Sequence, residues 1–386
     1  MGKKVGIVSY GIMEYGDHGA IRKWADEATF IVARQALDKV GLNRDDLDVV
    51  VISTMDAFDG ITISNGLLVP AAGAYAKESV RIENSGIHCV MSGMASILSD
   101  SADIVIVASA DTVKTDFGYV TNSNQDQFFR GPLGFNAYQS YGLLSMDYMR
   151  RSGATENDFA LAASRNYQNG KTNPFGHVKK AYSTEDIMAS PMVSWPLREL
   201  EIGRPSYGAS AIILASEEKA KQLTDEPIWL TGIGAATNNY SGNWSELSEL
   251  RAMKKACTKA YSMAGIKNPK DELDFIEVLN VFSPFELMAY EALGICKEGK
   301  GVNMLRDGKT LIDGDIPVNP SGGAMCTNAY NSGGIYRTIQ SIKCLNNDNG
   351  GTKVKNARRC LLHDSDIGIG AVGGDSHAVL IMEKGR

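Results

Sequence analysis

The 386-residue sequence lacks the features that would assign it to a special class of protein. No uninterrupted apolar run approaches the roughly 20 residues that a membrane-spanning helix requires. No secretory leader precedes the first apolar strand pattern, and the six cysteines form no CxxC pair, which excludes a zinc ribbon within this chain. We therefore expect a reduced, cytoplasmic, soluble protein that holds no metal.

Clustered positive charge is also scarce. The formal net charge is −6, and the basic clusters, such as Lys179-Lys180 and Arg358-Arg359, are short. A protein that binds nucleic acid neutralises phosphates with many grouped Lys and Arg side chains. The sequence thus predicts no nucleic-acid partner and no membrane partner.

What is present is an ordinary globular composition with an internal repeat. Hydrophobic residues make up 44% of a chain that is long enough for two or three domains. Residues 33–54 and 257–280 share one pattern, in which a helix ends near a glycine and an acidic loop leads through Leu-Asp into an apolar strand. Gly41 and Gly265 stand where a left-handed helix cap suits glycine. The repeat predicts two similar α/β halves, residues 1–225 and 226–386.

Short apolar segments elsewhere fit buried strands in both halves. They are residues 5–12, 102–111, 227–235, 358–365 and 377–384. Helical patterns alternate with them, which is typical of sheets with parallel strands. The sequence therefore predicts an α/β fold.

A long segment, about 112–205, interrupts the first half. It carries aromatic and Asn-rich stretches, and Thr155 to Asp158 has the pattern of a capped helix start. We interpret the segment as an insertion that covers a functional site. A thicker contact between subunits explains the same pattern equally well.

Cys89 is the candidate nucleophile. It follows an expected strand and precedes small and apolar residues that can begin a helix, where the helix dipole favours a thiolate. Gly86 and Gly93 would allow a sharp turn and close packing, and His88 is a neighbouring proton partner. The alternative is a buried cysteine that acts as a small hydrophobic residue.

The second half carries the stretches that resemble a known family. Residues 275–301 (FIEVLNVFSPFELMAYEALGICKEGKG), residues 316–328 (IPVNPSGGAMCTN) and the pair Gly333-Gly334 resemble the C-terminal half of thiolases. Residues 189–220 are similar to the segment that closes the first thiolase half. The resemblance implies a five-layered αβαβα fold, a homodimer, CoA thioester substrates and a nucleophilic cysteine at Cys89.

Several positions depart from the family. Leu279 and Asn280 stand where archaeal-type and sterol-carrier-protein-x-type thiolases carry a His-Asp pair, and Asn328 takes the place of another histidine. An asparagine amide can support an oxyanion but cannot shuttle a proton. Ala371 stands where a second catalytic cysteine is expected, and Tyr207 replaces an acidic residue.

These departures leave the acid–base group open among Cys326, His363 and His377. We prefer His363, because a histidine at the carboxyl end of a parallel strand faces the crevice where α/β proteins bind ligands. Cys326 is second, since it lies in a glycine-flanked turn beside Asn328. His377 is expected to face a core or a subunit contact.

The resemblance implies further substrate-binding positions and partners. The expected substrate-binding residues are Gly322, Gly323, Asn280, Tyr207, Gly373 and Gly374. Variants of this kind resemble thiolases that work with a small OB-fold zinc-ribbon protein, so we expect such a partner.

We expect thiolysis of a 3-oxoacyl-CoA, or its reverse, with CoA as a substrate and no other cofactor. Cys89 would carry the acyl group, Asn328 and backbone N–H groups would form the oxyanion hole, and His363 would activate a thiol. The altered pocket suggests a bulky or aromatic substrate, such as benzoylsuccinyl-CoA. A condensing enzyme similar to ketoacyl or hydroxymethylglutaryl synthases, and a non-catalytic scaffold of the same fold that binds CoA or holds a partner subunit, are the alternatives.

Overall fold

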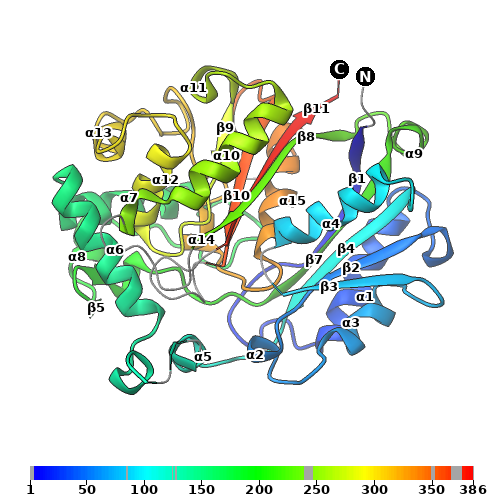
Figure 1. Cartoon of the computed structure of the whole chain (residues 1–386), viewed down its shortest axis with the longest axis horizontal. Helices are drawn as coiled ribbons and strands as arrows, with labels where there is room; N and C mark the ends of the chain where they lie inside the picture. Colours follow the sequence, from blue (N-terminus) through cyan, green and yellow to red (C-terminus); the bar gives the residue numbers. More distant parts are fainter. Residues whose placement is uncertain are drawn as a thin grey trace.

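The computed structural model describes residues 4–83, 86–123, 125–126, 128–238, 247–348, 353–366 and 376–385. Its centre is a nine-stranded sheet in the order β3-β2-β4-β7-β1-β8-β11-β10-β9 (Figure 1). The strands are β1 (Val5–Ile12), β2 (Val49–Ser53), β3 (Glu78–Ile82), β4 (Ile104–Asp111), β7 (Gly208–Ser216), β8 (Ile228–Thr237), β9 (Phe275–Glu277), β10 (Arg359–Ser365) and β11 (Ser376–Lys384). The strands expected from the sequence are all present.

The sheet consists of two halves with one topology. In the first half β2 is parallel to β3 and β4, and β7 is antiparallel to β4 and β1. In the second half β9 is parallel to β10, and β11 is antiparallel to β10 and β8. Among the described residues, two pairs join β1 to β8, Gly6 with Trp229 and Ile7 with Ile228. The duplicated halves are confirmed, but the expectation of parallel strands is only partly right, because the sheet is mixed.

Helices fill three layers around the two halves. Helices α4 (Gly86–Leu98) and α15 (Gly333–Leu345) share one core with inward side chains of both halves. Helix α1 (Ala25–Asp38) and α3 (Asn65–Ala71) cover the far face of the first half. Helices α10 (Arg251–Ala264) and α12 (Ser283–Ala292) cover the far face of the second. This arrangement is the expected five-layered αβαβα fold (Figure 1).

The segment between β4 and β7 is largely helical. It contains α5 (Phe117–Ser123), α6 (Ala137–Ser152), α7 (Glu156–Gly170), α8 (Thr184–Met188) and the two-stranded sheet of β5 (Met192–Ser194) and β6 (Leu197–Arg198). Helix α7 begins at the expected capping box, where the Asp158 carboxylate accepts from the Thr155 N–H. Helices α6 and α7 pack against α12, so this segment covers the second half.

The remaining helices are short connectors. They are α2 (Asp56–Asp59), α9 (Glu217–Leu223), α11 (Pro269–Glu272), α13 (Gly301–Arg306) and α14 (Gly323–Cys326). The boundary expected between residues 225 and 226 falls between α9 and β8 and stays a prediction. Within the described residues, no helix is both long and apolar enough to cross a membrane.

Candidate functional site

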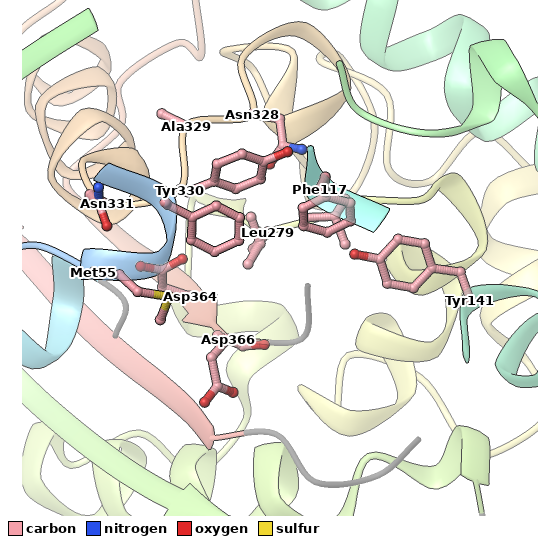
Figure 2. A pocket seen from close by; sticks show the side chains of 13 residues that line it. Met55, Phe117, Tyr141, Leu279, Asn328, Ala329, Tyr330, Asn331, Asp364 and Asp366 are labelled. Carbon is pink, nitrogen blue, oxygen red and sulfur yellow. The ribbon is translucent and has the colours of Figure 1, made fainter. Parts of the chain in front are cut away.

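A cavity lies where the carboxyl ends of strands from both halves meet the covering segment (Figure 2). Its walls come from the turn after β2, the helices α5 and α6, the segment after β9, the turn after α14 and the end of β10. The lining residues are Met55, Phe58, Phe117, Tyr141, Leu279, Val281, Asn328, Ala329, Tyr330, Asn331, Asp364, Ser365 and Asp366. The carboxyl ends of strands are where open α/β sheets bind ligands.

Stacked aromatic rings form one wall of this cavity. Tyr330 stacks on Phe58 with 4.4 Å between ring centroids and on Phe117 with 5.2 Å. Burial raises the pKa of Tyr330 well above its usual value, so the phenol keeps its proton at neutral pH. Tyr141 stacks on Phe282 behind the same wall. The cavity therefore combines flat apolar surfaces with a phenolic hydrogen-bond donor.

Two asparagines bring amide groups to the cavity. Asn328 donates its Nδ2 to the Gly203 carbonyl at 2.9 Å and its backbone N–H to the Ser206 hydroxyl at 3.0 Å. Asn331 donates its Nδ2 to Asp59 at 2.9 Å. An Asn Nδ2 carries two hydrogens, and these bonds to Gly203 and Asp59 each use one of them.

Two buried carboxyl groups stand behind Asn331. Asp111, at the end of β4, accepts the backbone N–H groups of Asn331 and Ser332 at 2.9 Å each, which anchors the start of α15. Burial raises the pKa of Asp59 to about 7, and the nearby Asp111 charge adds to this. Asp59 can thus change its charge near neutral pH.

Cys89, the expected nucleophile, is buried in the first turns of α4 and does not line the cavity. Burial raises the pKa of its thiol to about 12, and although a hydrogen bond with Ser53 lowers the pKa, the Asp364 charge raises it further. The expected gain from the helix N-terminus is thus outweighed by desolvation. His88 lies beside Ser376, with 3.2 Å between Nε2 and Oγ.

His363 and His377 face away from Cys89. On β10, Leu361 and His363 point toward α12, and His363 stacks on Phe285 of that helix at 5.7 Å. His363 Nε2 and His377 Nδ1 are 2.9 Å apart. Burial, the neighbouring His377 and Arg337 lower the pKa of His363 well below its usual value. The structure does not bring His363 together with Cys89.

Asp364, the next residue on β10, has the opposite orientation. Its carboxylate pairs with Arg337 of α15, and both side chains are almost fully buried. The residue lines the cavity together with Met55 and Tyr330, and Figure 2 shows its carboxylate on the Met55 side. Asp364 therefore places a paired negative charge at the cavity wall.

Cys326 and the neighbouring glycines serve close packing. Cys326 is 1% exposed and its thiol donates to the Asn166 carbonyl at 3.4 Å, outside the cavity. Gly322 and Gly323 have φ of 93° and 58°, and a Cβ on Gly323 would lie 2.3 Å from Asn280 Oδ1. Their roles in catalysis or substrate binding stay predictions.

Asn280 belongs to a buried polar network. Its Oδ1 accepts the Ala324 N–H at 2.8 Å and its Nδ2 donates to Glu286 at 2.8 Å. Both ends of this amide are engaged, whereas the adjacent Leu279 lines the cavity as expected from its place in the sequence. Tyr207 is buried, contacts His18 edge-on at 5.3 Å and lines a different cavity together with it. Ala371, Gly373 and Gly374 lie outside the described residues.

A second cavity adjoins the first. Asn328 lines the first and bonds to Gly203, which lines the second, and Tyr138 of the second contacts Phe117 of the first edge-on at 5.6 Å. The other lining residues are Tyr167, Val178, Tyr182, Val193, Glu199, Leu200, Ile202, Arg204 and Pro205. The two cavities are therefore neighbours whose walls touch at these two contacts.

Sequence reasoning missed Phe58, Asp59, Tyr330 and Asp364. Tyr330 lies two positions after Asn328, and Asp364 directly follows His363. The alternation of side chains along a strand was a signal that Asp364 and His363 face opposite ways. Nothing in the local sequence of Phe58 or Asp59 indicates a site. The residues that the structure brings together from the expected set are Asn328 and Leu279.

Comparisons with known proteins agree with this architecture. Residues 234–384 match the family described as thiolase C-terminal domain-like. The chain is 29% identical over 360 residues to the acetyl-CoA acetyltransferase of Methanothermobacter thermautotrophicus, covering 90% of this chain and 92% of that protein. It is 28% identical over 217 residues to the benzoylsuccinyl-CoA thiolase subunit BbsB of Thauera aromatica, covering 56% of each protein.

A solved structure shares the whole fold. The Ltp2-ChsH2(DUF35) aldolase superposes with a TM-score of 0.82 at 19% identity, over 99% of this chain and 98% of that chain. The duplicated halves, the helices between them and the matching sequence of the second half together show that this chain belongs to the thiolase superfamily.

Proposed function

We propose that this protein makes or breaks a carbon–carbon bond beside the thioester of an acyl-CoA, as a thiolase-family enzyme. The observation that carries the proposal is the aromatic cavity at the carboxyl ends of β2, β9 and β10, within a thiolase-superfamily fold. The similarity to proteins named acetyl-CoA acetyltransferase and benzoylsuccinyl-CoA thiolase supports an acyl-CoA substrate.

The cavity walls favour a bulky or aromatic acyl group. Phe58, Tyr330 and Phe117 offer stacked ring faces, and Leu279 replaces a polar catalytic residue with apolar surface. Aromatic pairs add about 0.5–1.5 kcal/mol beyond the area that they bury. The adjoining cavity, with Arg204 at its rim, would hold the CoA arm.

The first candidate reaction is thiolysis through Cys89. The thiolate would attack the 3-oxo carbon, the C2–C3 bond would break, and the enolate of the shortened acyl-CoA would take up a proton at C2 and leave. The thiol of CoA would then take the acyl group from the cysteine, and its proton would return to the Cys89 thiol. Asn328 would stabilise the oxyanion. Burial of Cys89 and its raised pKa oppose this route.

The second candidate is retro-aldol cleavage of a 3-hydroxyacyl-CoA, which needs no cysteine. A carboxylate takes the hydroxyl proton, the C2–C3 bond breaks, C3 leaves as an aldehyde or ketone, and the electron pair forms a thioester enolate that is then protonated at C2. The groups at the cavity favour this reaction: Asp364 is the carboxylate, and the Tyr330 phenol donates to the thioester oxygen. The similar fold of a protein named as an aldolase supports it further.

One experiment separates these reactions. The purified protein would be given a 3-oxoacyl-CoA with CoA, and separately a 3-hydroxyacyl-CoA, and the products followed by mass spectrometry. Thiolysis yields two acyl-CoA products and fails in Cys89→Ala. Retro-aldol cleavage yields one acyl-CoA and one carbonyl compound and survives that substitution. No product from either substrate, with or without a partner subunit, would favour a scaffold that binds CoA.

We further propose a homodimer that assembles with a small OB-fold zinc-ribbon protein. The two-protein name of the similar aldolase structure supports the second part. Light scattering would test both parts by measuring the molar mass of the protein alone and mixed with the candidate subunit. A monomer whose molar mass does not change when the subunit is added would contradict them.

A further inference from the structure

We propose that Asp59 is a positioning residue for the cavity, which holds Asn331 and thereby fixes the orientation of Tyr330. The inference rests on the proposed function only in taking Tyr330 to face the acyl group. Asp59 ends α2 and is 8% exposed. It touches neither cavity itself.

The hydrogen bonds of Asp59 join two distant parts of the chain. Its Oδ1 accepts from Asn331 Nδ2 at 2.9 Å, and its Oδ2 accepts the Met55 N–H at 3.2 Å. The first bond spans 272 positions of sequence, and the second ties the carboxylate to its own helical turn. Asp59 therefore fixes the distance between α2 and the turn at residues 328–331, which lines the cavity and is called the cavity turn below.

A second contact lies beside this hydrogen bond, between Phe58, which precedes Asp59, and Tyr330, which precedes Asn331. Phe58 stacks on Tyr330 at 4.4 Å with 20° between the ring planes. Two consecutive residues of α2 thus hold two consecutive residues of the cavity turn, one by stacking and one by a hydrogen bond. Thr115 donates to the Phe58 carbonyl at 2.7 Å, which connects the same turn to the segment that carries Phe117.

The backbone of the cavity turn has a separate anchor. Asp111 accepts the N–H groups of Asn331 and Ser332, so the main chain stays in place without Asp59. Loss of the Asp59 carboxylate should therefore loosen side chains at 330 and 331 and leave α15 intact. This separation distinguishes a positioning role from a general structural one.

The groups that face Asp59 make the contact sensitive to pH. Asp111, from β4, is the titratable neighbour, and burial raises its pKa as well. The other groups are polar: the Ser64 hydroxyl, the Met55 N–H and the Asn331 amide. A carboxylate accepts a hydrogen bond from an amide more strongly than a protonated carboxyl does. The hydrogen bond from the Asn331 amide to Asp59 should therefore weaken below about pH 7, where Asp59 gains its proton.

The test places 3-fluorotyrosine at position 330 and follows its ¹⁹F resonance, which needs no activity. In the labelled protein with no further change, the parent, we expect one resonance whose chemical shift changes between about pH 6 and pH 8. It should stop moving in Asp59→Asn and should broaden or split in Asp59→Ala. Asp158→Asn, which removes a carboxylate that pairs with Arg306 and lines neither cavity, is the control and should match the parent.

Turnover of the acyl-CoA substrate is the second readout. Asp59→Ala should lower kcat by roughly tenfold to a hundredfold, because the phenol is misplaced, and Asp59→Asn should restore most of it. If Asp59→Ala does not fold, Asp59→Ser replaces it. The inference is wrong if the chemical shift and line width of this ¹⁹F resonance change neither with pH nor on loss of the Asp59 carboxylate, even where activity falls. A moving resonance in a protein without activity refutes the proposed function instead.

Discussion

His363 and Cys89 lie on opposite sides of strand β10. His363 packs on Phe285 of α12, whereas Cys89 shares a core with Cys360 and Leu362 of the same strand. Neighbouring residues of a strand face opposite sides of the sheet, so a proton cannot pass directly between these two side chains. A nucleophile and its base need hydrogen-bond reach, which this pair does not have.

We expect Cys89→Ala to keep most of the carbon–carbon bond activity. The thiol is buried, its pKa is raised to about 12 and it is absent from the cavity wall. Loss of the buried sulfur should lower the free energy of unfolding by about 1 kcal/mol, because a small cavity is left. Turnover and urea unfolding measure the two effects. A loss of activity beyond about a hundredfold (near 3 kcal/mol), with an acyl group found on Cys89 in the parent, would restore the cysteine mechanism.

Tyr330→Phe should affect turnover strongly and stability little, the reverse of Cys89→Ala. The ring stack with Phe58 and Phe117 survives, so the free energy of unfolding should change by less than about 1 kcal/mol. Turnover should fall by roughly a hundredfold, as for the loss of one oxyanion donor. Tyr141→Phe is the matched control, since Tyr141 lines the same cavity but stacks on Phe282. Equal turnover in Tyr330→Phe and the parent would remove the phenol from the mechanism.

The fold could be predicted because its signals are local. The strands at 5–12 and 377–384 are short apolar runs between polar segments, and Gly265 caps α10 at φ 69°, as its place after the helical pattern indicates. The mixed direction of the strands left no such trace, since β11 looks the same in sequence whether it runs parallel or antiparallel to β10. Direction follows from connections that span the whole domain.

The site could be predicted only where family resemblance and geometry agree. Asn328 lies in the cavity because the glycine turn before it is a backbone feature that the sequence reveals. Asp59 could not be found, since its function depends on a contact across 272 positions. The burial of Cys89 depends on how deeply α4 sits between the two halves, which no local pattern encodes.

Gly323→Ala should be far more destabilising than Gly265→Ala. Both glycines have positive φ, 58° and 69°, so each alanine would bear a similar backbone strain of about 1 kcal/mol. At Gly265 a Cβ would meet nothing within 4 Å, but at Gly323 it would lie 2.3 Å from Asn280 Oδ1. We expect a total cost of about 3 kcal/mol or more at Gly323, measured by urea unfolding. Equal effects would mean that the turn can shift away from Asn280.

Asn280→Ala should show how much the buried hydrogen-bond network around Glu286 contributes to the free energy of unfolding. The Glu286 carboxylate accepts from Asn166 at 2.6 Å, from Asn280 at 2.8 Å and from Asn319 at 3.1 Å, as well as from Tyr290. Loss of Asn280 removes one donor and leaves the Ala324 N–H without its acceptor. The free energy of unfolding should fall by about 2–4 kcal/mol. Asn280→Asp should cost at least as much, because a second carboxylate would face Glu286. A neutral result for both would show that water replaces the amide.

Glu277 should make the protein less stable as the pH rises toward 7. Its carboxyl accepts the Ser321 N–H at 2.9 Å and the Ser321 hydroxyl at 2.7 Å, yet burial raises its pKa from 4.5 to about 7. The folded state therefore binds more protons than the unfolded state between these values, so its contribution to stability is complete below about pH 4.5 and is lost as the pH rises to about 7. Glu277→Gln removes this dependence and should flatten the curve of unfolding free energy against pH by an amount on the order of 3 kcal/mol. Glu217→Gln, on the exposed start of α9, is the control and should leave the slope unchanged. If Glu277→Gln keeps the parent's slope over this range, the carboxyl is ionised in the folded protein and Arg337 offsets its burial.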